Sequence, residues 1–150
     1  MLKTILLFWG LFVIIFITDQ YLKHLILEGF RYPTDCIDIT YALNKGVAFS
    51  MFAWVGEYLK YIQSALLLFG ISYVFAKGYI LQYWVPIALL LGGGVGNVYD
   101  RFIHGGVVDY VYWHCGFDFA IFNLADVLID IAVVLIIIIS YKNDKKTVKE

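Results

Sequence analysis

The sequence is poor in charged residues and contains only two cysteines and two prolines. Charged side chains make up 15% of its 150 residues, whereas a soluble domain carries about 25%. The net charge of −1 lacks the basic excess expected of a nucleic-acid-binding protein, so we expect no nucleic acid partner. Cys36 and Cys115 fit no metal-ligand spacing. A disulfide between them is possible but not expected.

Motifs for metals and phosphates are also missing. His24, His104 and His114 have no mutual spacing typical of a metal site, so we expect neither a metal nor a cofactor. The glycines at 92–94 and at Gly96 are not followed by the Gly-Lys-Ser/Thr of a phosphate-binding loop. These glycines instead favour close packing of a helix against its neighbours.

Apolar residues are abundant and occur in long runs. Hydrophobic residues make up 62% of the chain, and the mean hydropathy is +0.80. Four segments, at about 2–20, 58–76, 79–98 and 124–141, are predicted to cross a membrane. The first is expected to continue as a helix to Leu27 and, without a small-residue cleavage site, to be a retained anchor. We predict one integral membrane domain over residues 1–150.

The lysines predict how these segments are oriented. Lys3 lies at the start of the first segment, Lys77 lies between the second and third, and four more lysines follow the fourth. Positive residues mark the cytoplasmic side, so both termini are predicted to be cytoplasmic. The connections 28–57 and 99–121 are then expected to lie on the outer face.

The outer connections are predicted to contain a small sheet. Apolar and polar residues alternate over 37–43, a turn follows at 44–46, and residues 47–52 could return as the second arm of a β-hairpin. The stretch 107–121 is rich in valine and aromatic residues and could add a strand. The predicted fold is a mainly α membrane protein with four transmembrane helices. An extracytoplasmic β-sheet cradle is expected over about 31–55 and 106–121.

Two aspartates at the outer face are the candidate reactive groups. A carboxylate at the edge of hydrocarbon is energetically expensive and is rarely found there without a function. Asp109 and Asp126, on the same side, could share a proton and activate water as an aspartic protease does. Each also has a simpler explanation. Asp109 could be a solvated loop acid, and Asp126 an acidic first-turn residue of a helix capped by Asn123.

Further polar residues lie near the same predicted boundary. Asn97 and Arg101 share a helix face, and the arginine could orient carboxylates, bind a lipid phosphate or extend into headgroups. Asp19 and Lys23 are spaced for an ion pair that could brace the floor of a site.

Five motifs in order resemble those of the lipoprotein signal peptidases, also called signal peptidase II. They are Thr18-Asp19-Gln20 with Lys23, the segment 44–50, Gly93-Gly94 through Asn97 to Asp100-Arg101, Val107-Val108-Asp109-Tyr110, and Phe122-Asn123-Leu124-Ala125-Asp126. The resemblance covers nearly the whole chain. It implies a bacterial inner-membrane aspartic endopeptidase that removes signal peptides from diacylglyceryl-modified prolipoproteins, cutting before the lipidated cysteine.

The resemblance also implies roles for individual residues and partners. Asp109 and Asp126 fall on the catalytic dyad, and the substrate-binding or supporting positions are Asn44, Asn97, Arg101, Asn123, Asp19 and Lys23. Membrane phospholipids and globomycin-type inhibitors are the other expected partners, and the chain is expected to act as a monomer. Val47, Tyr110 and Asp130 depart from the family pattern, and Asp130 would add negative charge near the dyad if it faced the site.

Two other functions remain open. Asp19, Asp126 and Asp130 could form the relay of a small proton or ion transporter. The central parts of the second and third segments carry no ionisable residue, which favours an enzyme at the outer face. A non-catalytic assembly subunit is the third possibility.

Overall fold

A computed structural model of the chain describes residues 1–46, 51 and 53–147. These residues form four long helices, α1 (Leu2–Leu27), α2 (Gly56–Ala76), α3 (Ile80–His104) and α4 (Leu124–Thr147). A short 3-10 helix, η2 (Ala53–Val55), precedes α2, and strands β1 (Ile37–Asn44) and β2 (Val107–Trp113) form one antiparallel sheet. Each long helix has the length and composition to cross a membrane. The predicted fold class is confirmed, and α4 continues beyond its predicted boundary at residue 141.

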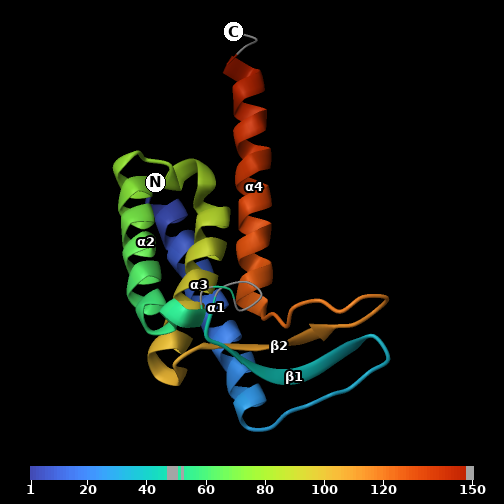
Figure 1. The fold of residues 1–150 in the computed structure, drawn as a ribbon. Coiled ribbons are helices and arrows are strands. Elements are labelled where there is room, and N and C mark those ends of the chain that lie inside the picture. The colour runs from blue at the N-terminus through green and yellow to red at the C-terminus, as the bar shows by residue number, and fades with distance from the viewer. Residues whose placement is uncertain (47–50, 52, 148–150) are drawn as a thin grey trace.

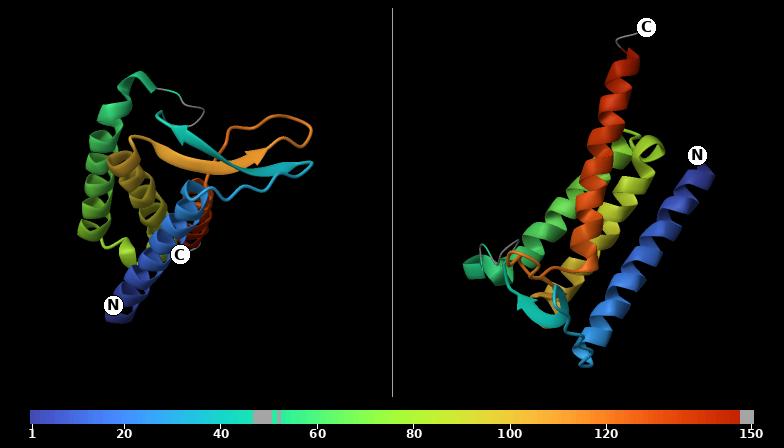
Figure 2. Two further views of the ribbon diagram at one scale, coloured as in Figure 1. Left: turned by 90° about the horizontal axis from the view of Figure 1, so that it is seen from below. Right: turned by 90° about the vertical axis from the view of Figure 1, so that its right-hand side faces the viewer.

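The sheet lies across one end of the helices, and the N-terminus and the far end of α4 lie at the other (Figures 1 and 2). α3 is the central helix and packs against α1, α2 and α4. A protein with an even number of spans has both ends on one side of the membrane, so this arrangement is compatible with the predicted topology.

Glycines on α3 let two other helices approach it closely. A Cβ atom at Gly92 would lie 2.6 Å from a side-chain carbon of Ile15 in α1. A Cβ atom at Gly93 would lie 2.8 Å from the carbonyl oxygen of Ala125 in α4. A larger residue at either position would push a helix away, which confirms the predicted packing role of these glycines.

The end of α3 leads directly into β2. Gly105 follows the helix with a φ of 73°, a left-handed conformation that glycine adopts without strain. The chain then turns back over the last turns of α3 as β2. Between β2 and the end of α1, Ile26, Val108 and Tyr110 form an apolar cluster that holds the strand on the helix.

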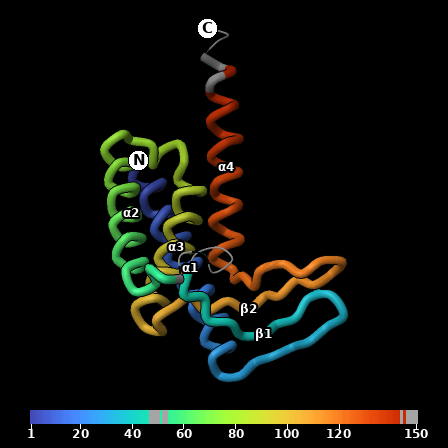
Figure 3. Tube along the Cα trace, viewed as in Figure 1, coloured from blue at the N-terminus to red at the C-terminus, as the bar shows by residue number. Residues whose placement is uncertain are grey.

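The partner of β1 is a distant strand. β1 pairs with β2, with Ile37 opposite Trp113 and Asn44 opposite Val107. Figure 3 shows the two strands side by side although they come from different parts of the chain. The predicted strand within 107–121 is confirmed. The predicted second arm of a local hairpin falls largely on residues 47–50 and 52, which lie outside the described residues.

The two cysteines are bonded to each other, the outcome that the sequence left possible but did not favour. Cys36 and Cys115 form a disulfide between the start of β1 and the loop after β2, with a Cα–Cα distance of 4.5 Å. The two residues are 79 positions apart in the sequence. Only the register of β1 against β2 brings them together, and a local pattern contains no information about that register.

Candidate active site

A short backbone bridge brings the start of α4 to the middle of the sheet. The Val111 N–H donates to the Phe122 carbonyl at 2.8 Å, and the Phe122 N–H donates to the Val111 carbonyl at 3.0 Å. The next residue, Asn123, therefore lies beside Asp109 of β2. Its side-chain oxygen accepts the Asp126 N–H at 3.0 Å, and the Asp126 carboxylate accepts the Asn123 N–H at 3.1 Å. This reciprocal capping confirms the predicted helix start.

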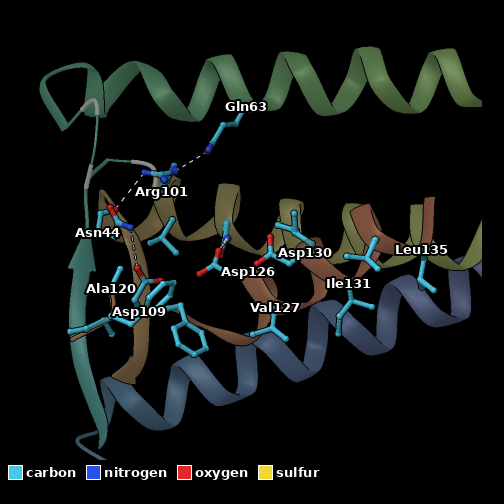
Figure 4. A pocket seen from close by; sticks show the side chains of 17 residues that line it. Asn44, Gln63, Arg101, Asp109, Ala120, Asp126, Val127, Asp130, Ile131 and Leu135 are labelled. Carbon is cyan, nitrogen blue, oxygen red and sulfur yellow. Dashed lines mark hydrogen bonds between the residues drawn. The ribbon is translucent and has the colours of Figure 1, made fainter. Parts of the chain in front are cut away.

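Amide groups surround both candidate carboxylates. Asp109 is buried, and its two oxygens accept N–H groups from Asn123 at 2.7 Å and from Asn44 at 3.1 Å. Asp126 accepts the side-chain N–H of Asn97 at 2.9 Å in addition to the backbone of Asn123. Asn123 thus contacts both acids, which border the same cavity in Figure 4. Asp109 is therefore a buried site residue, not the solvated loop acid of the simpler explanation.

The environment of Asp109 favours its protonated form. Burial is the main cause, and the negative charge of Asp126 adds to it, raising the pKa of Asp109 to about 6. The hydrogen bonds from Asn44 and Asn123 act in the opposite direction because they stabilise the carboxylate. The group therefore titrates close to neutral pH, where it can take up and release a proton.

A buried ion cluster forms the floor of the site. Lys23 is 1% exposed and forms ion pairs with Asp19 and Asp100, each at 2.8 Å. Its ammonium also donates to the side-chain oxygen of Asn97 at 2.9 Å. An ammonium can only donate, so Asn97 must turn its oxygen to Lys23 and its NH₂ to Asp126. Asp19 and Lys23 thus lie where the sequence predicted a brace.

Asp100 was not among the predicted site residues. It is fully buried, accepts the Val108 N–H at 3.1 Å and also accepts an N–H of Gln20 at 3.0 Å. These bonds tie α1 and α3 to the residue immediately before Asp109. A carboxylate in an apolar helix was itself a signal of function that could have identified this residue.

Arg101 is buried and does not extend into headgroups. It is 5% exposed, and its guanidinium donates to the side chain of Gln63 at 2.8 Å and to the carbonyl oxygens of Gly46 and, at 3.5 Å, Asn44. Its hydrogen bonds in the described residues go to these groups and not to carboxylates. Arg101 thereby holds the end of β1 that carries Asn44. Gln63, an amide in the second apolar segment, was missed.

The site opens into a cavity of about 800 Å³. Its polar lining comprises Asn44, Gln63, Asn97, Arg101, Asp109, Asp126 and Asp130, and its apolar walls include Phe119, Phe122, Val127, Ile131, Val134 and Leu135. Figure 4 shows the apolar wall continuing along α4 beyond the acids. Asp130 therefore faces the site. The shape suits a substrate with one polar group and a long apolar part.

The donors at this site are mainly amides. Within residues 1–46, 51 and 53–147, no group of three or more His, Cys, Asp or Glu side chains is arranged to hold a metal ion. The arrangement is suited to positioning two carboxyl groups and a water molecule against a polarised substrate group.

Comparison with known proteins identifies close relatives. The sequence model of the family described as signal peptidase (SPase) II matches residues 11–142. The chain is 59% identical over 128 residues to a lipoprotein signal peptidase of Sulfurovum sp. (strain NBC37-1), covering 85% of this chain and 87% of that protein. It is 50% identical over 137 residues to one from Campylobacter jejuni (strain RM1221), with 91% and 88% covered.

Solved structures share the fold. A structure described as a bacterial membrane enzyme, determined by the in meso method at 2.3 Å resolution, superposes with a TM-score of 0.80 at 31% identity, covering 96% of this chain and 90% of that one. A second, described in the same words at 1.9 Å resolution, gives a TM-score of 0.73 at 32% identity, with 91% and 90% covered.

Proposed function

The chain belongs to the signal peptidase II family, and from this membership we propose that it removes signal peptides from diacylglyceryl-modified prolipoproteins, cutting before the lipidated cysteine. Membership makes it a multi-pass bacterial membrane peptidase. The observation that supports the proposed chemistry is the position of Asn123, which donates to both Asp109 and Asp126 at the polar end of an apolar-walled cavity.

The proposed reaction is hydrolysis by an activated water. One carboxylate of the pair takes a proton from water while the other, protonated, donates to the scissile carbonyl and polarises it. The oxygen of the water bonds to the carbonyl carbon, and the C–N bond then breaks as the amine gains a proton. The two acids titrate as a coupled pair, so the roles belong to the pair and not to either residue alone. Asn44, Asn97 and Asn123 fix their orientation, and no covalent intermediate is needed.

The substrate is proposed to reach this site from the outer leaflet. Its acyl chains would stay among lipids, and its apolar signal segment would lie along α4 in the cavity. Three observations support an outer site and cytoplasmic termini: the distribution of lysines, the sheet at the end opposite both chain ends, and the disulfide. Disulfides persist in oxidising compartments outside the cytoplasm.

Other binding partners follow from the same geometry. Membrane phospholipids would surround the four spans, and a globomycin-type cyclic peptide would occupy the cavity beside Asp109 and Asp126. The protein is proposed to act as a monomer because one chain supplies both acids and their amide partners. Globomycin should inhibit competitively with the lipidated precursor if it binds there.

The decisive experiment measures cleavage of a lipidated precursor by the purified protein. Asp109→Asn and Asp126→Asn should each lower kcat by about 10³-fold or more. Asp35→Asn, which changes an exposed acid outside the cavity, is the matched control and should retain full turnover. Full activity in either dyad variant would refute the proposed mechanism.

The transporter alternative has less support. A relay needs ionisable groups at several depths, but Asp19 and Asp126 lie at the sheet end of the helices, and Asp130 lies only about one turn further along α4. A pH-flux assay in proteoliposomes distinguishes the two functions, because a peptidase should show no proton flux dependent on these acids.

A further inference from the structure

Asp130 is a carboxylate in the cavity wall without a protein partner. It follows Asp126 by four residues, so it lies on the same face of α4 about 6 Å further along the helix. It lines the cavity beside Val127, Ile131 and Val134, as Figure 4 shows for the first two. No hydrogen bond or ion pair of its carboxylate occurs within the described part of the chain.

The two cations of the site, Lys23 and Arg101, bond to groups other than Asp130. Lys23 bonds to Asp19, Asp100 and Asn97, and Arg101 bonds to Gln63 and backbone carbonyls. A carboxylate in a membrane-spanning segment is expensive unless a donor or water satisfies it. Asp130 is exposed in the chain by itself, so such a donor comes from water or from whatever occupies the cavity and displaces that water.

The proposed function defines this occupant, and the inference rests on it. With the scissile bond at Asp109 and Asp126, the signal segment runs from there toward the membrane interior, in the direction in which α4 leads away from the sheet. A distance of about 6 Å corresponds to about two residues of extended chain or about four of helix. Asp130 then faces a side chain that lies two to four residues before the cut.

We propose that Asp130 is a specificity-determining residue that accepts a hydrogen bond from a hydroxyl side chain two to four residues before the scissile bond. A preference arises because a substrate with only aliphatic side chains leaves the carboxylate without a donor in an apolar cavity. Serine or threonine at that position satisfies the carboxylate and is selected over valine.

The test uses lipidated precursor peptides that differ only by threonine or valine, two side chains of nearly equal size, at each of these positions. At one position the wild-type protein should cleave the threonine peptide with a kcat/KM about tenfold higher, as expected for a hydrogen bond to a charged group. In Asp130→Leu, which has no acceptor, the ratio should fall to about one. Asp130→Asn keeps a neutral acceptor and should give an intermediate ratio.

The valine peptides separate this inference from the proposed function. If the wild-type protein cleaves none of the peptides, the peptidase function itself is refuted. If it cleaves them but shows the same threonine-to-valine ratio as Asp130→Leu at every position, only the role of Asp130 is refuted. A change in pH profile that is equal for both peptides in Asp130→Asn, with no change in their ratio, would also overturn it. Asp35→Leu, which removes an exposed acid outside the cavity, should keep the wild-type ratio.

Discussion

The side-chain amide of Asn123 donates to the carboxylate of Asp109 at 2.7 Å and so joins the first residue before α4 to strand β2. The backbone N–H of Asn123 also donates to Asp126. One residue therefore sets the relative position of both carboxyl groups. It contributes an amide to the site and a cap to the helix, and these two contributions can be separated experimentally.

Replacing Asn123 with another capping residue should lower turnover while leaving the free energy of unfolding nearly unchanged. Asn123→Ser keeps a good helix cap but loses the amide that reaches Asp109, so kcat should fall roughly 10- to 100-fold. Asn123→Ala loses both and should unfold about 1 kcal/mol more easily than Asn123→Ser. Precursor cleavage and thermal unfolding in detergent measure the two effects. Equal turnover in Asn123→Ser and the wild-type protein would contradict the assigned contact.

Lys23→Met should destabilise the protein strongly. It leaves Asp19 and Asp100 buried without their cation, and breaking a buried ion pair costs about 3–5 kcal/mol. Turnover should also fall because Asn97 is no longer held with its NH₂ toward Asp126. Thermal unfolding measures the first effect. Lys77→Met changes an exposed lysine in the turn before α3 and should leave the melting temperature within experimental error.

The protonation of Asp109 should shift when Asn44 is replaced. The pKa of Asp109 is raised from 3.8 to about 6, so its contribution to stability is complete below about pH 3.8 and is lost as the pH rises through about 6. Asn44→Ala removes a hydrogen bond that stabilises the carboxylate, so the pKa should rise further. Infrared titration of the protonated carboxyl band, assigned by its loss in Asp109→Asn, measures this shift. A downward shift in Asn44→Ala would contradict the geometry.

The disulfide provides a test of membrane orientation. Cys36→Ser leaves Cys115 as a free thiol beside the sheet. A membrane-impermeant maleimide added outside intact spheroplasts should label this variant, whereas the wild-type protein should become labelled only after reduction. Labelling that requires permeabilised membranes would place the sheet in the cytoplasm and overturn the proposed topology.

The sequence predicted the membrane spans well because their signal is local. A bilayer has one thickness, so the length of an apolar run is sufficient to identify a span. The distribution of lysines between the spans also predicted that Asp109 and Asp126 lie at the same end of the helices. The alternation over 37–43 predicted β1 but not its partner, since pairing with β2 depends on residues far along the chain.

One physical reason explains why the sequence did not predict the contacts of several residues. Asp100 and Gln63 acquire their roles only when helices pack side by side, and Arg101 could be assigned to backbone carbonyls only once the end of β1 was placed above it. The spacing of four residues puts Asp130 on the same helix face as Asp126, but whether that face borders a cavity depends on the neighbouring helices.

The sequence by itself thus determined the four spans and predicted an outer end and two candidate acids, because apolar length, lysine distribution and motif order are properties of the chain alone. Only the tertiary structure decided which amides face Asp109, which cation holds Asn97 and whether the two cysteines join. These contacts depend on distance and direction between segments that are remote in sequence. Strand register and helix packing set both quantities.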